Sequence, residues 1–261
     1  MSGHVALITG AASGIGLATA RRLRAEVDGL VLVDRNAEAL EALQDEFLDE
    51  DGQSSVMLAY ELDVADAASW PVLEEQVAEI YGGIDRLVVN AGVAAGAPVV
   101  ETAFEDWRRV MSVNLDGAFL SLQAGLRLMR KGGRGGSAVV VASVAGLKPE
   151  PGIAAYAASK AGVIQLARVA AKEHAAEKIR VNVMAPGGVE TPIWRDAPFF
   201  QDLVRSAGGE RQAFDQMAAM ATPLGRFADP DEIAGQIVFL LSEASAPMTG
   251  AVLVSDGGYS L

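Results

Sequence analysis

The sequence has no cysteine and only two histidines, His4 and His174, among 261 residues. Without cysteine, the chain can form no disulfide bond and offers no thiolate to a metal ion. Two histidines far apart in the sequence do not indicate a transition-metal centre, so we expect no bound metal. The composition is compatible with a reducing compartment.

Long apolar runs and an excess of basic residues are also missing. No stretch approaches the roughly 18 uninterrupted apolar residues of a membrane span. The N-terminal apolar run is short and lacks a preceding basic region, which argues against a signal peptide. The net charge is −13, and an acidic surface repels nucleic-acid phosphates and anionic lipid headgroups. We therefore predict a cytoplasmic protein that binds neither membranes nor nucleic acid.

Apolar residues make up 51% of the sequence, enough for one sizeable core. Short β-branched runs alternate with longer helical patterns along the chain. The predicted helices span residues 15–26, 37–48, 67–81, 104–129 (with a candidate break at Asn114), 156–175 and 230–241. The predicted strands are Val5–Thr9, Gly29–Val33, Ser55–Glu61, Arg86–Asn90, Ala138–Ala142, Arg180–Met184 and Ala251–Val254.

The continuously apolar character of these strands indicates a sheet that is covered on both faces. Alternation of strands and helices indicates parallel strands joined by right-handed crossovers. We predict one α/β domain over residues 1–261, a doubly wound parallel sheet of about seven strands with helices on both faces. In this architecture ligands bind beyond the carboxyl ends of the strands.

Residues 190–222 form the longest stretch without a clear period. Trp194, Phe199, Phe200 and Phe214 lie in it, together with several methionines. A long loop in a compact domain is often a lid, so we predict a substrate lid here. The alternative is a helical insertion that packs its aromatic side chains in the core.

A glycine-rich loop, residues 9–16, follows the first predicted strand. Its spacing is G-x-x-x-G-x-G, which differs from the general dinucleotide fingerprint G-x-G-x-x-G. Glycine lets the backbone turn sharply and approach a pyrophosphate, and the next helix directs its N–H groups and positive dipole end at the phosphates. A plain glycine-rich turn is the alternative. The predicted cofactor contacts are Gly10, Ser13, Gly14, Ile15 and Gly16.

Asp34 follows the second predicted strand, roughly 20 residues after the glycine-rich loop. A carboxylate there can accept hydrogen bonds from the adenosine ribose hydroxyls and repels the extra 2′-phosphate of NADP. NAD is therefore the predicted cofactor. Arg35 keeps an NADP alternative open, because a guanidinium beside Asp34 could pair with a 2′-phosphate.

Tyr156 and Lys160 are four residues apart in a helical segment, so their side chains share one face. A phenol with an unperturbed pKa of about 10 needs about 4 kcal/mol to be poised near pH 7. One ammonium at about 4 Å supplies that order of energy at an effective dielectric constant of 20. Tyr156 could then act as a general acid or base. The alternative is an aromatic ring that stacks on a lysine stem.

Ser143 and Asn114 are weaker candidates when each is taken alone. Ser143 follows a predicted strand, where its hydroxyl could hold a substrate oxygen or simply terminate the strand. Asn114 lies within a helical pattern that asparagine disfavours, which indicates a kink, an ordered water or an exposed side chain.

Together these residues resemble the short-chain dehydrogenase/reductase family over nearly the whole chain. The glycine-rich loop resembles the cofactor motif of that family. Val89 departs from the strand-four motif, since many members have asparagine there. Further matching positions are Asp63 and Val64 (adenine contact), Asn90, Ala91 and Gly92 (strand-four motif), Pro186, Gly187, Val189 and Thr191 (nicotinamide turn), and Gly250 with Asp256–Gly258 (C-terminal signature).

The resemblance implies a Rossmann-type domain with a catalytic tetrad. Tyr156 would exchange the proton and also contact the cofactor, while Ser143 would hold the substrate oxygen. Lys160 would bind the cofactor ribose and lower the pKa of the tyrosine, and Asn114 would hold a water molecule. The resemblance further implies a homotetramer or a homodimer.

The sequence therefore predicts an NAD-dependent dehydrogenase of a secondary alcohol. Two alternatives are an NADP-dependent carbonyl reductase, such as a 3-oxoacyl type, and an NAD-binding protein without catalysis. The substrate candidates are uncharged alicyclic, aromatic or fatty alcohols, unless Lys148 or Arg195 points inward. The candidate pocket residues are mostly apolar: Val93, Ala94, Val144, Ala145, Ile153, Gly188, Trp194, Phe199 and Phe200.

Overall fold

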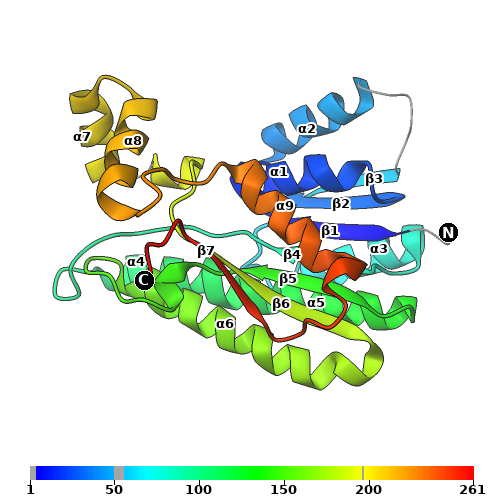
Figure 1. Cartoon of the computed structure of the whole chain (residues 1–261). Helices are drawn as coiled ribbons and strands as arrows, with labels where there is room; N and C mark the ends of the chain where they lie inside the picture. Colours follow the sequence, from blue (N-terminus) through cyan, green and yellow to red (C-terminus); the bar gives the residue numbers. More distant parts are fainter. Residues whose placement is uncertain (1–3, 50–55, 196) are drawn as a thin grey trace.

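Seven parallel strands form the centre of the molecule, in the order β3-β2-β1-β4-β5-β6-β7 (Figure 1). The computed structural model describes residues 4–49, 56–195 and 197–261. Ser55, the predicted first residue of β3, and residue 196 of the predicted lid lie outside this range. The strands are β1 (Val5–Thr9), β2 (Gly29–Asp34), β3 (Val56–Glu61), β4 (Arg86–Val89), β5 (Gly136–Val141), β6 (Ile179–Pro186) and β7 (Val252–Ser255).

Helices cover both faces of this sheet, which confirms the predicted fold class (Figure 1). Alternate residues of each strand face opposite layers, so Leu7 packs on one side and Ile8 on the other. One layer holds α1 (Gly14–Arg24), α2 (Ala37–Asp49) and α9 (Pro230–Leu241), and the other holds α3 (Trp70–Tyr81), α5 (Gly117–Gly132) and α6 (Ala154–His174).

The strand order reverses between β1 and β4, because β1 pairs with β2 on one side and β4 on the other. From β1 the chain adds β2 and β3 on one side of the sheet. It then crosses back and adds β4 to β7 on the other side of β1. Crossovers leave on opposite sides at this point, which opens a crevice beyond the carboxyl ends of β1 and β4. The glycine-rich loop and Asn90 lie at these two strand ends.

The predicted helix 104–129 is divided into three parts. Helix α4 (Phe104–Met111) leads into a π-helical turn, Ser112–Asp116, and then into α5. The π turn contains Asn114, which is 1% exposed. The break near this residue therefore has a physical cause, since the wider turn accompanies a buried asparagine side chain.

Residues 190–222 contain helices, unlike the expected stretch without a period. A 3₁₀ turn, Pro192–Trp194, precedes α7 (Pro198–Ala207) and α8 (Glu210–Ala221). Gly208 and Gly209, with φ of 88° and 154°, separate the two helices and interrupt the helical period. Figure 1 shows this pair projecting beyond the sheet.

A third apolar cluster holds α7 and α8 together, apart from the two layers of the sheet. Phe200, Phe214 and Phe227 are each at most 5% exposed. The Trp194 ring stacks on Phe227 with 5.9 Å between ring centroids. The interpretation of this segment as a helical insertion with packed aromatics therefore describes its static structure. Among the described helices, none is both long and apolar enough to span a membrane.

Candidate active site

The glycine-rich loop turns tightly between β1 and α1. Gly10 and Gly14 have φ of 65° and 51°, a region that glycine adopts without strain. A Cβ at Gly16 would lie 2.0 Å from the Gly10 carbonyl oxygen, so no other residue fits there. Ser13 precedes α1 and its side chain makes no capping bond, which leaves the first-turn amides to an anion. This backbone fits a dinucleotide pyrophosphate.

Asp34 ends β2 and lies beside the glycine-rich loop. Its Oδ2 accepts a hydrogen bond from the Ala12 amide at 3.0 Å, and its Oδ1 accepts one from the Asn36 amide at 3.1 Å. Each carboxylate oxygen has a second lone pair for a further donor. Arg35 is exposed beside it. Asp34 therefore fits a ribose diol at the edge of the predicted cofactor site.

Asn90 links the end of β4 to the glycine-rich loop through side-chain hydrogen bonds. Its Nδ2 donates to the carbonyl oxygens of Thr9 (3.0 Å) and Gly10 (3.1 Å). The Thr9 hydroxyl, which is fully buried, in turn accepts from the amides of Asn90 and Ala91. Sequence reasoning missed Thr9, although a polar residue at a buried strand end just before the first loop glycine is a usable signal.

Asp63 and Val64, the expected adenine contacts, differ in exposure. Asp63 is exposed and its Oδ1 accepts from the Ala65 amide at 2.9 Å. Val64 is buried, and a Cβ at Gly117 would lie 2.6 Å from its Cγ2. The Val64 carbonyl oxygen accepts from Trp70 Nε1. The side chain of Val64 thus belongs to the core, and Asp63 is the exposed member of the pair.

Tyr156 and Ser143 meet at the carboxyl end of β5. Ser143 follows this strand and hydrogen-bonds to Tyr156, on the first turn of α6. Burial raises the pKa of Tyr156, and the bond to Ser143 acts in the opposite direction. For the chain alone, the lowered pKa that the Tyr156–Lys160 spacing predicts is therefore wrong in direction. The physical reason is the loss of water around the phenol.

Lys160 lies one helical turn after Tyr156, as the spacing predicts. Its Nζ donates to the Val141 carbonyl oxygen at 2.9 Å and lies 5.7 Å from the Tyr156 ring centroid. The residue is 4% exposed, and burial lowers its pKa to about 8. A Cβ at Gly92 would lie 3.5 Å from this Nζ, so the strand-four motif lies beside the lysine.

The Asn114 side chain binds the backbone that follows β4. Its Oδ1 accepts from the Val93 amide at 2.8 Å, while Nδ2 donates to the Val93 carbonyl oxygen at 2.9 Å. Nδ2 also lies 3.2 Å from Ser159 Oγ. Asn114 therefore orders the strand-four motif against α6, next to Lys160.

The predicted nicotinamide turn follows β6. Gly187 donates its amide to the Ser255 carbonyl oxygen at 2.9 Å. Trp194 Nε1 donates to the Val189 carbonyl oxygen at 2.8 Å. A Cβ at Gly14 would lie 3.2 Å from Thr191 Cγ2, so this turn meets the glycine-rich loop directly. Pro186 is buried at the end of β6, and its carbonyl oxygen lies 3.5 Å from Ser143 Oγ.

The two cations near the predicted pocket both have partners. Lys148 Nζ donates to the Tyr259 carbonyl oxygen at 2.7 Å. Arg195 pairs with Glu210 at 3.0 Å and is mostly exposed. Of the predicted pocket residues, Phe200 lies inside the third cluster whereas Phe199 is 56% exposed. The sequence did not reveal that Lys148 binds the Tyr259 carbonyl oxygen, since this partner comes from the distant C-terminus.

Known proteins match almost the entire chain. A family model described as enoyl-(acyl carrier protein) reductase matches residues 10–260. The 3-oxoacyl-[acyl-carrier-protein] reductase FabG of Thermotoga maritima is 40% identical over 258 residues, covering 99% of this chain and 98% of the relative. The D-threitol dehydrogenase of Mycolicibacterium smegmatis is 40% identical over 262 residues, covering 100% and 94%.

A solved structure matches the fold equally broadly. Carveol dehydrogenase from Mycobacterium avium in complex with NAD superposes with a TM-score of 0.90 at 29% identity, covering 98% of this chain and 97% of that one. Fold and matches together define a nicotinamide-dependent oxidoreductase that transfers a hydride between its cofactor and an alcohol or ketone. The chain belongs to the short-chain dehydrogenase/reductase family.

Proposed function

We propose that this enzyme uses NAD to oxidise an uncharged secondary alcohol, or to reduce the corresponding ketone, with Tyr156 as general base or acid. The observation that carries the proposal is the cluster of Tyr156, Ser143 and Lys160 at the carboxyl end of β5. The site is reached from the same sheet edge as the glycine-rich loop. The cofactor, when bound, supplies the chemistry that accepts or donates the hydride.

Each residue of the cluster has a separate task in this proposal. Tyr156 takes the alcohol proton during oxidation and returns it during reduction. Ser143 positions the substrate oxygen and supports the tyrosine by its hydrogen bond. Lys160 supplies positive charge near the phenol while it stays protonated, and Asn114 keeps the backbone beside it in place. The expected water at Asn114 remains a prediction.

The proposed cofactor contacts follow the geometry of the crevice. The amides of the glycine-rich loop and the first turn of α1 hold the pyrophosphate, and Asp34 holds the adenosine ribose. A carboxylate at this position favours NAD over NADP, whose 2′-phosphate it repels. Arg35 is the observation that supports an NADP-dependent reductase as the second candidate. The expected contacts of Asp63, Asn90, Ala91, Gly92, Val189 and Thr191 are part of the same proposal.

An uncharged substrate fits the charges beside the site. Lys148 and Arg195 each already have a partner in the protein, which weakens their attraction for a substrate carboxylate. The α7–α8 segment presents the exposed Phe199 and Met220. We propose that this segment is the substrate lid. The relative named for D-threitol and the relative named for a 3-oxoacyl carrier-protein substrate supply the competing polyol and acyl substrates for the test.

The enzyme is also proposed to be a cytoplasmic homotetramer or homodimer. Exposed apolar side chains on α4, α5 and α6 support an interface on that face: Phe104, Phe119 and Val169 are between 44% and 68% exposed. Light scattering coupled to size-exclusion chromatography measures the mass directly. A monomer at micromolar concentration would contradict this part of the proposal.

The decisive experiment measures NAD⁺ reduction over a panel of alicyclic, aromatic, fatty and polyol secondary alcohols, with NADP⁺ in parallel. Replacing Tyr156 with Phe should lower kcat by 10²–10⁴-fold, as expected for loss of a general acid or base. The dissociation constant of NADH should stay within about twofold, since the phenyl ring keeps its packing. Tyr60→Phe on β3 is the matched control and should keep full turnover.

Three results would contradict the proposal. Retained turnover in the Tyr156→Phe variant would remove the assigned role of that residue. Tighter binding of NADPH than of NADH would favour the NADP-dependent reductase. Tight NADH binding without turnover of any alcohol or ketone would favour a binding protein without catalysis.

A further inference from the structure

The last residues of the chain form a tight turn that the proposed mechanism does not use. Asp256 accepts hydrogen bonds from the Gly258 amide at its Oδ1 and from the Ser260 amide at its Oδ2, each at 2.9 Å. Gly257 and Gly258 have φ of 64° and 87°. We call residues 256–260 the C-terminal turn. Its shape is defined by the aspartate side chain, which accepts two backbone hydrogen bonds, and by the left-handed conformations of the two glycines.

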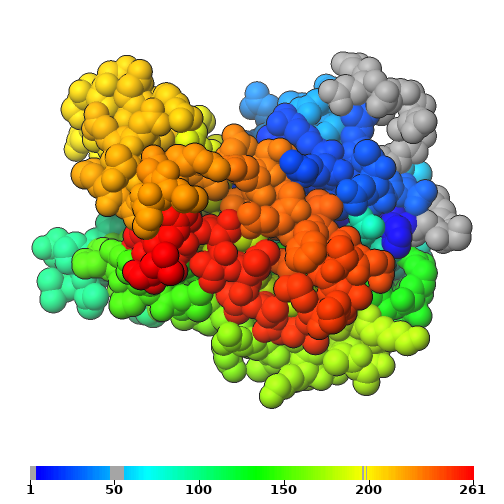
Figure 2. All heavy atoms as spheres, viewed as in Figure 1, coloured from blue at the N-terminus to red at the C-terminus, as the bar shows by residue number. Residues whose placement is uncertain are grey.

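The C-terminal turn packs against two segments at the edge of the site. A Cβ at Gly187 in the nicotinamide turn would lie only 2.7 Å from Asp256 Cα. Leu224, just after α8, donates its amide to the Gly257 carbonyl oxygen at 3.1 Å. Figure 2 shows the red C-terminal atoms seated directly against the orange segment that leads to α9.

A third segment, the loop between Ser143 and Tyr156, is bound through Lys148. The Lys148 ammonium donates to the Tyr259 carbonyl oxygen at 2.7 Å and lies 4.1 Å from the centroid of the Tyr259 ring. Glu150 lies 4.0 Å from the same ammonium and hydrogen-bonds to the Tyr259 hydroxyl. Burial and this carboxylate raise the pKa of Tyr259, so its hydroxyl remains a donor.

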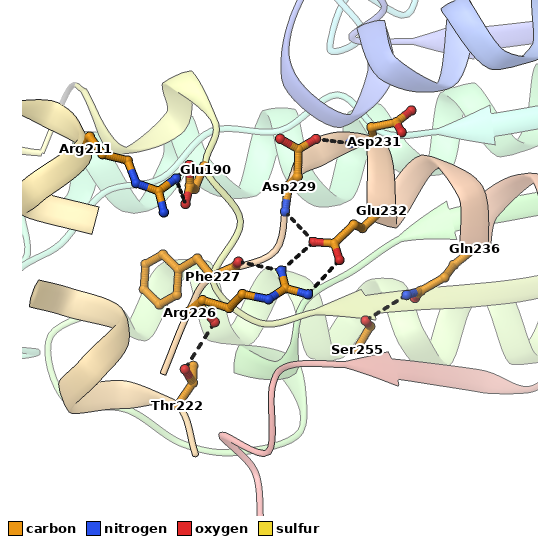
Figure 3. Close-up of polar contacts among 10 residues, drawn as sticks. All are labelled: Glu190, Arg211, Thr222, Arg226, Phe227, Asp229, Asp231, Glu232, Gln236 and Ser255. Carbon is orange, nitrogen blue, oxygen red and sulfur yellow. Dashed lines mark hydrogen bonds and ion pairs between the residues drawn. The ribbon is translucent and has the colours of Figure 1, made fainter. Parts of the chain in front are cut away.

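The segment after α8 is anchored on its other side as well. Arg226 forms two hydrogen bonds with the Glu232 carboxylate on α9, at 2.6 and 2.7 Å. The Thr222 hydroxyl donates to the Arg226 carbonyl oxygen at 3.2 Å (Figure 3). This segment stays fixed to α9, so we expect a loss of the C-terminal turn to loosen one wall of the site and to leave the sheet intact.

We propose that Lys148 and Tyr259 are positioning residues that set the affinity for the alcohol or ketone. Their contact holds the C-terminal turn between the Ser143–Tyr156 loop and the end of α8, and we call this contact the clasp. The inference rests on the proposed function and extends it. The clasp fixes the distance between the two walls on the substrate side of Tyr156. Among the described residues, no hydrogen bond joins the C-terminal turn to the glycine-rich loop or to Asp34, which would hold the pyrophosphate and the adenosine ribose; on the cofactor side the turn meets the backbone at Gly187.

The kinetic test compares Lys148→Met and Tyr259→Ala with the unchanged enzyme on its best alcohol. Loss of one charge-assisted hydrogen bond should raise KM for the alcohol by about tenfold in Lys148→Met, and kcat and the NADH dissociation constant should change less than about twofold. Lys148→Arg keeps a donor and should restore most of the affinity. Lys131→Met, at an exposed lysine at the end of α5, is the matched control.

A second readout does not depend on activity. Hydrogen exchange at the Leu224 amide should be at least about tenfold faster in Lys148→Met, because its acceptor Gly257 is no longer held. Unchanged exchange in both variants would overturn the clasp, as would a rise in the NADH dissociation constant equal to the rise in KM. If the unchanged enzyme turns over no alcohol or ketone, the proposed function fails, and the exchange measurement still decides whether the clasp exists.

Discussion

At the scale of single residues, Lys160 shows how burial opposes charge. The side chain is 4% exposed and keeps one hydrogen bond to the Val141 carbonyl oxygen. Burial lowers its pKa to about 8, below the ordinary value of 10.5. The folded protein therefore releases this proton more readily than the unfolded chain does. Conformational stability must depend on pH as a consequence.

We predict that Lys160→Met stabilises the protein more at pH 7 than at pH 10.5. The gain in the free energy of unfolding should differ by about 3 kcal/mol between the two pH values, which is the energy that corresponds to lowering the lysine pKa from 10.5 to about 8. Below pH 8 the lysine is charged in both states, so the folded state bears the full cost of burying the charge. As the pH rises from about 8 to 10.5, only the unfolded chain stays protonated and the cost disappears. Urea unfolding of both proteins across this range measures the difference. A difference that does not vary with pH would contradict the prediction.

At the scale of elements, the π turn between α4 and α5 depends on one side chain. The Asn114 side chain accepts from the Val93 amide and donates to the Val93 carbonyl oxygen. It therefore satisfies the same two backbone groups that a neighbouring β-strand would satisfy. The sequence indicated a disturbance here, because asparagine is unfavourable inside a helix. It did not reveal the partner, since Val93 lies 21 residues away in an irregular segment.

We predict that Asn114→Ala lowers the free energy of unfolding by roughly 2–3 kcal/mol, because two backbone groups of Val93 lose their partners. Asn114→Asp keeps an acceptor for the Val93 amide but buries a carboxylate against the Val93 carbonyl oxygen, so it should lose at least as much. Chemical denaturation gives both values, and circular dichroism serves as the control for helix content. If alanine and aspartate were equally neutral, the Val93 contacts would not stabilise the fold.

At the scale of the whole molecule, the chain divides its apolar residues into three clusters. Two of them lie on opposite faces of the sheet, and the third lies inside the α7–α8 insertion. Two ion pairs, Arg195–Glu210 and Glu190–Arg211 (Figure 3), join this insertion to the segment after β6. Because the insertion has an apolar cluster of its own, we expect that it can loosen while the sheet remains folded.

We predict that Phe214→Ala opens the insertion locally. The ring is 5% exposed and lies 4.8 Å from the Phe200 ring centroid, and such truncations cost about 3–5 kcal/mol. Limited trypsin digestion should become at least about tenfold faster after Arg205 and Arg211, while the N-terminal fragment that ends at Arg205 persists. Met220→Ala, at a residue that is 81% exposed, is the control. Loss of the whole chain at one rate would show that the insertion and the sheet unfold together.

Local sequence patterns determined the sheet, its two helical layers and the order of the predicted site residues. Continuous apolar strands need two covering layers. Gly16 lies where the backbone turns too closely for a side chain, and Asp34 lies at the end of a strand. Tertiary structure decided what no local pattern contains. The direction of the Tyr156 pKa shift depends on burial, and the Asn114 contacts depend on a segment 21 residues away. The carbonyl oxygen that Lys148 binds lies 111 residues further along the chain. These properties arise from packing between distant segments, which only the folded chain brings together.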